Sequence, residues 1–264
     1  MDAGKGTVTH MVSVTFRRLG CWIALAMFVF GQSSFAAKPM LTLSTEDGPP
    51  HMIQASNDGI DIDIVRSVLV ELGYDVDVVY APLERCKLSV KQGLFDLTVP
   101  TFVTSDSDGF YVSEPVINYR PTVFSKANTK FSSLKDIQDL RVATFQGARG
   151  YFGPQFVSMS RKNRYVEYSN MSVLSSLLLK DRTDVVVLDY YIFYYYLREM
   201  NQFDRLHEIQ ENAIIPPVQA AVGFHSKSLR DQFNQAFDKF KKAGGVKKIE
   251  RTYIGDVPQW VHNP

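Results

Sequence analysis

Short apolar runs alternate with amphipathic stretches along the chain from residue 40 onward. The runs at residues 40–45, 75–80 and 94–100 have the length and composition of β-strands. Residues 62–73 and 83–93 instead carry apolar positions at helical spacing and end in glycine. The order strand, helix, strand, helix, strand predicts a parallel sheet with helices on its faces.

The second half of the chain repeats this alternation. We expect strands at residues 141–145, 165–169, 184–189 and 219–225. We expect helices at residues 132–140, after the glycine-rich turn within 146–156, at 171–181, from Tyr190 onward, and twice within 228–253, with a break at Gly244 and Gly245.

Two α/β units in tandem predict an α/β fold with two lobes and two parallel-rich sheets. Lobe 1 is expected at residues 38–123, lobe 2 at 124–217, and a return to lobe 1 with C-terminal helices at 218–264. Extended segments at 122–128 and 218–224 would cross between the lobes. Two such crossings form a hinge beside a cleft.

The first 37 residues have the pattern of a secretory signal peptide. Arg17 and Arg18 precede a short apolar run, and small residues follow near Ala36 and Ala37. The alternative is an uncleaved anchor, although the run is short for a membrane span. We therefore expect export to the periplasm and a soluble mature chain.

Charge and cysteine content narrow the possible functions. The net charge of +1 gives no indication of nucleic-acid binding. Removal of residues 1–37 takes three bases and one acid from 29 and 28, which leaves a net charge of −1. The mature chain would keep only Cys86, so we expect no disulfide, no cysteine-based metal site and no cofactor.

A carboxylate closes one of the most apolar runs of the chain. Residues 184–188 are followed by Asp189, and six of the next seven residues are aromatic. Ligands of open parallel sheets lie beyond the carboxyl ends of the strands, where Asp189 could accept a hydrogen bond from a ligand ammonium. The alternative role is a helix N-cap. Most of the tyrosines are expected to pack in the core or lie on the surface, with Tyr190 near the cleft rim.

A glycine-rich turn follows the expected strand at residues 141–145. The backbone N–H groups of Gly147, Ala148 and Arg149 could hold a carboxylate, and the Arg149 side chain adds a positive charge. The alternative is an ordinary surface turn with a solvated arginine.

Taken in order, these segments resemble the extracytoplasmic solute-binding proteins of the amino-acid type, family 3. The resemblance rests on "STEDGPPHMI", "GIDIDIVRSVLVELGY", "APLERCKLSVKQGLFDL", "GFYVSEPVINYRPTVFSK", "SLKDIQDLRVATFQGARG" and "LLLKDRTDVVVLD". It implies a two-lobed monomer that closes on a small polar solute and then docks on an inner-membrane ABC permease or a sensor protein.

The resemblance also implies roles for particular residues. It favours Asp189 as an amine-binding residue over a plain N-cap. Glu46, Asp47 and His51 follow the first strand, where the family lines its cleft. Arg85 resembles a cleft arginine at the start of the second helix, although an exposed arginine there would be ordinary.

One stretch departs from the family pattern. Amino-acid binders carry an arginine that grips the ligand α-carboxylate, but the corresponding stretch from Thr104 to Pro115 has Ser107 at that position. Thr104 remains a candidate cleft residue. Either another arginine (Arg149, Arg85 or Arg120) replaces the missing one, or the ligand is not an ordinary α-amino acid.

Two other functions remain open from the sequence. A ligand-sensing module for a membrane sensor would use the same closed lobes. An enzyme resembling the cyclohexadienyl dehydratases of this fold would need a general acid, for which Glu46 and His51 are candidates. No nucleophile–base spacing or metal motif appears, so we expect a binding protein rather than an enzyme.

Overall fold

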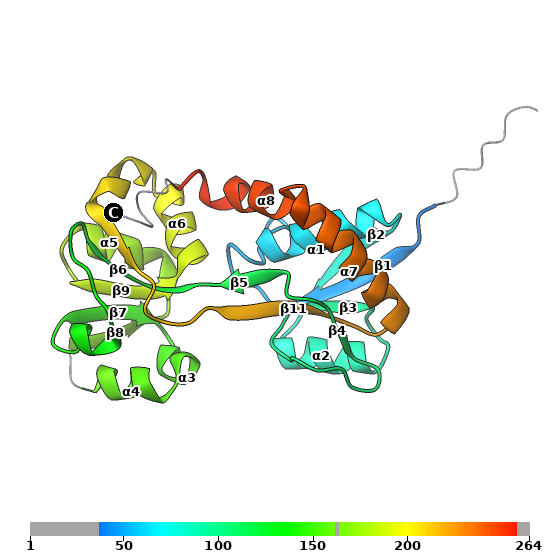
Figure 1. Ribbon diagram of the computed structural model, residues 1–264, viewed down its shortest axis with the longest axis horizontal. Helices are drawn as coiled ribbons and strands as arrows, with labels where there is room; N and C mark the ends of the chain where they lie inside the picture. Colours follow the sequence, from blue (N-terminus) through cyan, green and yellow to red (C-terminus); the bar gives the residue numbers. More distant parts are fainter. Residues whose placement is uncertain (1–36, 162–163, 258–264) are drawn as a thin grey trace, which may run out of the picture. The chain divides into compact units, whose positions relative to one another are not determined.

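The computed structural model describes residues 37–161 and 164–257 (Figure 1). All of the expected signal peptide except Ala37 lies outside the described residues. The strands are β1 (Met40–Thr45), β2 (Asp75–Tyr80), β3 (Leu97–Thr101), β4 (Tyr111–Val112), β5 (Ile117–Tyr119), β6 (Pro121–Lys126), β7 (Arg141–Phe145), β8 (Arg164–Tyr168), β9 (Val185–Asp189), β10 (Ile209–Asn212) and β11 (Val218–Phe224). The helices are α1 (Ile60–Glu71), α2 (Leu83–Lys91), α3 (Ala148–Phe152), α4 (Pro154–Ser160), α5 (Leu174–Leu179), α6 (Tyr190–Glu199), α7 (Lys227–Lys242) and α8 (Gly245–Ile254), with 3₁₀ turns η1 (Leu134–Ile137), η2 (Met171–Val173) and η3 (Phe203–Glu208).

The first sheet has the strand order β2-β1-β3-β11-β4, and β5 also pairs with β11. Strand β1 is parallel to β2 and β3, whereas β11 runs antiparallel to β3. Helices α1, α7 and α8 pack against one another on one side of this sheet, and α2 contacts β3 and β11 on the other (Figure 1). We call this sheet with α1, α2, α7 and α8 the first lobe.

The second sheet has the strand order β10-β6-β9-β7-β8. Strand β9 is parallel to β7 and antiparallel to β6. Its residues alternate between two cores: Val185 and Val187 pack in the cluster that contains Phe156 of α4, whereas Val186 and Leu188 pack in the cluster that contains α5 and α6. A strand that is covered on both faces has a nearly continuous apolar sequence, and β9 has such a sequence. We call this sheet with α3–α6 the second lobe.

The chain passes between the two sheets twice. Residue Arg120 separates β5 from β6, and residues 213–217 separate β10 from β11. Beside these crossings β5 pairs antiparallel with β11, so the two segments run side by side (Figure 1). The expected domain limits at 123/124 and 217/218 lie next to these crossings and remain a prediction.

One expected helix is much shorter than predicted. Residues 132–140 contain only the 3₁₀ turn η1. The Asp136 carboxylate accepts hydrogen bonds from the N–H groups of Ser132 and Ser133 at 2.7 and 2.9 Å. The following backbone bonds join Gln138 N–H to the Lys135 carbonyl and Leu140 N–H to the Ile137 carbonyl, which is the 3₁₀ pattern, and such helices rarely exceed about four residues.

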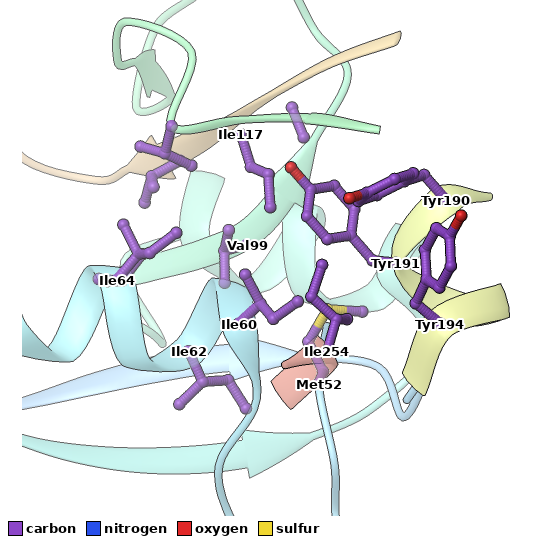
Figure 2. Close-up of a cluster of buried hydrophobic side chains, with 14 of the residues drawn as sticks. Met52, Ile60, Ile62, Ile64, Val99, Ile117, Tyr190, Tyr191, Tyr194 and Ile254 are labelled. Carbon is purple, nitrogen blue, oxygen red and sulfur yellow. The ribbon is translucent and has the colours of Figure 1, made fainter. Parts of the chain in front are cut away.

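The aromatic stretch forms helix α6, and most of its rings are core. Tyr190, Tyr191, Phe193 and Tyr194 are buried. They share one apolar cluster with residues of the first lobe, and Figure 2 shows Tyr191 extending from α6 toward Ile117 of β5. The prediction that most tyrosines pack in the core or on the surface therefore agrees with their positions. Among the described residues, none of the helices has the length and apolar character needed to cross a membrane.

Candidate functional site

Asp189 lies at the junction of β9 and α6, and its carboxylate has several partners. It caps α6 by accepting the Tyr191 N–H at 2.8 Å, and its other oxygen accepts the Arg120 N–H at 2.6 Å. The register that pairs Pro121 with Asp189 brings this crossing segment beside the carboxylate. Asp189 is therefore the N-cap of α6, and its side chain is 13% exposed. A role in binding a ligand amine remains a prediction.

His51 reaches Asp189 from the other sheet. It follows β1, and its Nδ1 lies 2.9 Å from Asp61 Oδ1 while its Nε2 lies 3.4 Å from Asp189 Oδ1. The Tyr119 ring packs at 4.2 Å and the Tyr191 ring at 5.4 Å from the imidazole. His51 therefore joins the loop after β1 to the carboxyl end of β9.

The loop that carries His51 is closed by the start of α1. The Asp61 N–H donates to the His51 carbonyl at 3.0 Å, and the Ile60 N–H donates to the Pro50 carbonyl at 2.9 Å. Gly59 makes this possible with a φ of 139°, a value that side chains rarely allow. The same turn buries Asp61 completely beside the imidazole.

Burial alone would lower the pKa of His51, but the carboxylates of Asp61 and Asp189 outweigh it and raise the pKa to about 9. The imidazole is therefore protonated at neutral pH, and both of its nitrogens donate. The remaining oxygen of Asp61 accepts the Tyr119 hydroxyl at 2.7 Å. Of the two carboxyl groups beside His51, that of Asp61 is fully buried and that of Asp189 is partly exposed.

Two exposed aromatic side chains lie near this cluster. Phe102 follows β3, is 43% exposed, and packs its ring 5.7 Å from the Tyr119 ring. Tyr151 of α3 is 47% exposed, and burial together with the nearby charge of Asp189 raises its pKa to about 12. Large apolar rings left exposed at strand ends are typical of ligand sites.

The glycine-rich turn holds an anion that the chain itself supplies. Glu167 of β8 accepts the Gly147 N–H at 2.9 Å, and its other oxygen lies 3.5 Å from the Arg149 N–H. The Tyr165 hydroxyl donates to the same carboxylate at 2.5 Å. The hydrogen bond from Tyr165, followed by that from Gly147, lowers the pKa of Glu167. The turn has N–H groups that bind an anion, and Glu167 contacts two of the three expected donors, those of Gly147 and Arg149.

The arginines proposed as substitutes for the missing family arginine lie in three different settings. Arg149 donates from Nε to Ser160 Oγ at 2.9 Å, and its guanidinium lies 4.4 Å from the Tyr165 ring centroid. The guanidinium of Arg120 lies 3.8 Å over the ring of Tyr190, which is buried; a place for Tyr190 near the cleft rim remains a prediction. Arg85 is exposed on α2.

The other expected residues are mostly at the surface. Glu46 and Asp47 are exposed after β1, and Asp47 accepts the Gln54 N–H at 2.8 Å. Thr104 is exposed, whereas Ala148 is fully buried. Their contribution to ligand binding remains a prediction.

Sequence reasoning missed four residues of this region: Asp61, Phe102, Tyr119 and Tyr151. Phe102 could have been found, because it directly follows a strand whose carboxyl end faces the expected site. Asp61 and Tyr119 have no such signal, since only the folded chain brings them to His51.

One hollow reaches two residues that contact the His51 and Asp189 side chains, and another lies away from them. A groove of about 670 Å³ is bordered by Arg120, Tyr191 and Glu250, beside the crossing strands. A pocket of about 750 Å³ lies between η1 and α4 and contains none of the expected site residues. We base the candidate site on its chemistry and on its position at the strand ends. In the part of the chain that the structure describes, no group of three or more metal-ligating side chains occurs.

Comparison with known proteins places this geometry in a family. A comparison with curated protein sequences found no match. Among solved structures, the chain is similar to a substrate-binding protein of a polar amino acid ABC uptake transporter from Streptococcus thermophilus, with 20% identity, a TM-score of 0.65, and coverage of 84% of this chain and 89% of that one.

Two further solved structures show the same fold. The L-cystine solute receptor of Neisseria gonorrhoeae, in its unliganded open conformation, has 18% identity and a TM-score of 0.63, with 83% of this chain and 94% of that one covered. A histidine kinase sensor domain with similarity to periplasmic binding proteins has 15% identity and a TM-score of 0.56, with 83% and 97% covered. The likeness shows a two-lobed fold of the periplasmic binding protein type.

The family model that matches the sequence covers almost all of the described chain. It is that of the bacterial extracellular solute-binding proteins, family 3, and it matches residues 41–256. Both lobes and both crossings fall within this range. The chain is therefore a member of family 3 of the bacterial extracellular solute-binding proteins.

Proposed function

We propose that the protein binds a small polar solute with an amine group, an amino acid or another amine-bearing compound, between its two lobes. The solute-loaded protein then closes and delivers the solute to an ABC transporter from the periplasm. Family membership supports solute binding, and the relative from Streptococcus thermophilus supports transport.

The observation that carries this proposal is the position of Asp189. Its carboxylate stands at the carboxyl end of β9, is held by backbone N–H groups, and faces His51 of the first lobe. At 3.4 Å the His51 contact is long for a hydrogen bond, and in the proposed complex a ligand ammonium takes its place on the carboxylate. The amine would then lie at the meeting point of the two lobes.

The same carboxylate connects the ligand to the hinge. Asp189 accepts the N–H of Arg120, the residue that separates β5 from β6, and the Arg120 carbonyl accepts the Tyr190 N–H at 2.9 Å. A ligand bound to Asp189 therefore acts on the crossing segment through one hydrogen bond. This supports lobe closure as the response to binding.

Native mass spectrometry of the purified protein, followed by a thermal-shift panel of amino acids, polyamines and dicarboxylates, tests the proposal. We expect amine-bearing compounds to raise the melting temperature, because a ligand that binds only the native state stabilises it. Asp189→Ser keeps a helix-capping side chain but removes the carboxylate, and it should abolish the shift. A panel in which only dicarboxylates bind, or an Asp189→Ser variant with unchanged affinity, would contradict the proposal.

A second candidate is a ligand-sensing module for a membrane sensor, which the likeness to a histidine kinase sensor domain supports. Both candidates use the same ligand site, so they differ in the partner. A deletion strain separates them: loss of labelled solute uptake supports delivery to a transporter. Normal uptake with loss of the solute-dependent transcriptional response supports sensing.

A further inference from the structure

The anion-binding turn of the second lobe is filled by the protein. Glu167 takes the N–H group of Gly147 and is hydrogen-bonded by the Tyr165 hydroxyl. A ligand carboxylate brought to this turn would have to displace Glu167 or lie beside its negative charge. Each alternative costs free energy, since like charges repel and displacing Glu167 breaks its hydrogen bonds with Gly147 and Tyr165.

The basic side chains nearest the site also have other partners. Arg149 lies over Tyr165 and donates to Ser160, and Arg120 lies over Tyr190. Arginine stacked in this way is fixed by its aromatic partner. The face of each guanidinium is therefore taken by a ring and the Nε of Arg149 by Ser160, so a ligand carboxylate could meet only the remaining N–H groups at the guanidinium edge.

The opposite charge is available around Asp189. The side chain of Asp189 is partly exposed beside His51, and the exposed acids Glu46 and Asp47 follow the same strand as His51. The exposed rings of Phe102 and Tyr151 add electron-rich faces. Ammonium and guanidinium groups are attracted both to carboxylates and to aromatic faces.

We propose that the solute is an organic cation without a free carboxylate, because the carboxylate of Glu167 binds the N–H of Gly147 in the anion-binding turn, whereas the partly exposed carboxylate of Asp189 and the exposed rings of Phe102 and Tyr151 can face a cation. This inference rests on the proposed function and names the ligand class of the same site. It also makes Glu167 a specificity-determining residue, since its carboxylate takes the place of a ligand carboxylate.

Matched pairs of compounds that differ by one carboxylate test the inference by isothermal titration calorimetry. The pairs are agmatine and arginine, cadaverine and lysine, and putrescine and ornithine. In each pair that binds, we expect the compound without the carboxylate to bind at least about tenfold more tightly, the effect of about one charge-assisted hydrogen bond.

The results separate this inference from the proposed function. Equal or tighter binding of the amino acids overturns the inference and leaves the proposed function standing. Arg85→Ala then shows whether that exposed arginine is the carboxylate ligand. If no member of any pair binds, the proposed amine-binding function fails and the inference fails with it.

Substitution of Glu167 tests the reason for the selectivity. Glu167→Ala frees the Gly147 N–H, so arginine should gain on the order of tenfold in affinity while agmatine changes little. Glu71→Ala removes the same charge from the exposed end of α1 and serves as the control. Glu167→Gln keeps the shape of the side chain, and its affinity for arginine should lie between those of the parent protein and of Glu167→Ala. It also shows whether an effect of the alanine variant comes from misfolding. Unchanged selectivity in both Glu167 variants overturns the role of Glu167.

Discussion

The Nε2 atom of His51 lies 3.4 Å from Oδ1 of Asp189, although 138 positions separate the two residues in the sequence. His51 belongs to the loop after β1 in the first lobe, and Asp189 ends β9 in the second. A protonated imidazole between two carboxylates therefore joins the lobes at the place where we propose that the ligand binds. The protonation of His51, the contacts of its neighbours and the backbone conformation that positions its loop can each be tested.

The protonation of His51 predicts that stability depends on pH. Its pKa of about 9 in the folded protein exceeds the ordinary value of 6.5, so the folded state binds this proton more tightly. The resulting stabilisation is fully present below pH 6.5 and is lost as the pH rises through 9. We expect the free energy of unfolding to fall by on the order of 1–3 kcal/mol across this window, measured by urea denaturation.

Neighbouring groups do not obscure this titration. Burial raises the pKa of Tyr119 and of Tyr191 above the ordinary value, so both hydroxyls stay protonated up to pH 9. His51→Asn should remove most of the pH dependence, whereas His207→Asn, at an exposed position, should leave it intact. A His51→Asn variant with the same pH profile as the parent protein would contradict the prediction.

Substitutions of Asp189 separate its capping role from its charge. Asp189→Ala should lower the free energy of unfolding by about 0.5–2 kcal/mol, because α6 loses the side chain that accepts the Tyr191 N–H. Asp189→Ser should recover much of this loss but not amine binding. The measurements are urea denaturation and calorimetric titration. Equal stability of the serine and alanine variants would argue against the cap.

Gly59 holds the backbone that positions His51. An added Cβ would lie 2.3 Å from the His51 carbonyl oxygen, at a φ of 139°. Gly59→Ala should therefore destabilise the protein by about 1–3 kcal/mol or more and shift the pH profile, because the loop must move. Gly150→Ala is the matched control: its Cβ would meet nothing within 4 Å, and we expect a neutral or slightly stabilising effect. A similar melting temperature for both variants would refute the argument.

The last prediction concerns a hydrogen bond between helices of different lobes. The Tyr191 hydroxyl of α6 donates to Glu250 of α8 at 2.7 Å. Tyr191→Phe keeps the ring beside His51 but removes this bond, so we expect a loss of about 1 kcal/mol in the free energy of unfolding. Tyr195→Phe, on a partly exposed position of the same helix, should change it by less. If the two variants lose the same amount, the bond to Glu250 does not contribute as proposed.

Much of the fold could be predicted because its signals are local. The apolar run of β9, the helical spacing of α1 and the break at Gly244 each depend on neighbouring residues, and each is present in the structure. The short strands β4, β5 and β10 were missed because two to four residues carry too little periodicity. The predicted length of the helix at residues 132–140 was wrong because its backbone bonds follow the 3₁₀ pattern, which apolar spacing does not distinguish from an α-helix.

The sequence by itself determined the alternation of strands and helices, the likeness to a solute-binding family, and Asp189 at a strand end, since all of these depend on the order of residues along the chain. Only the tertiary structure decided that His51 lies between Asp61 and Asp189, and that Glu167 fills the glycine-rich turn. The physical reason is that a charged side chain takes its partner from whatever the packing of the sheets brings within about 3 Å, and no local pattern records that neighbour.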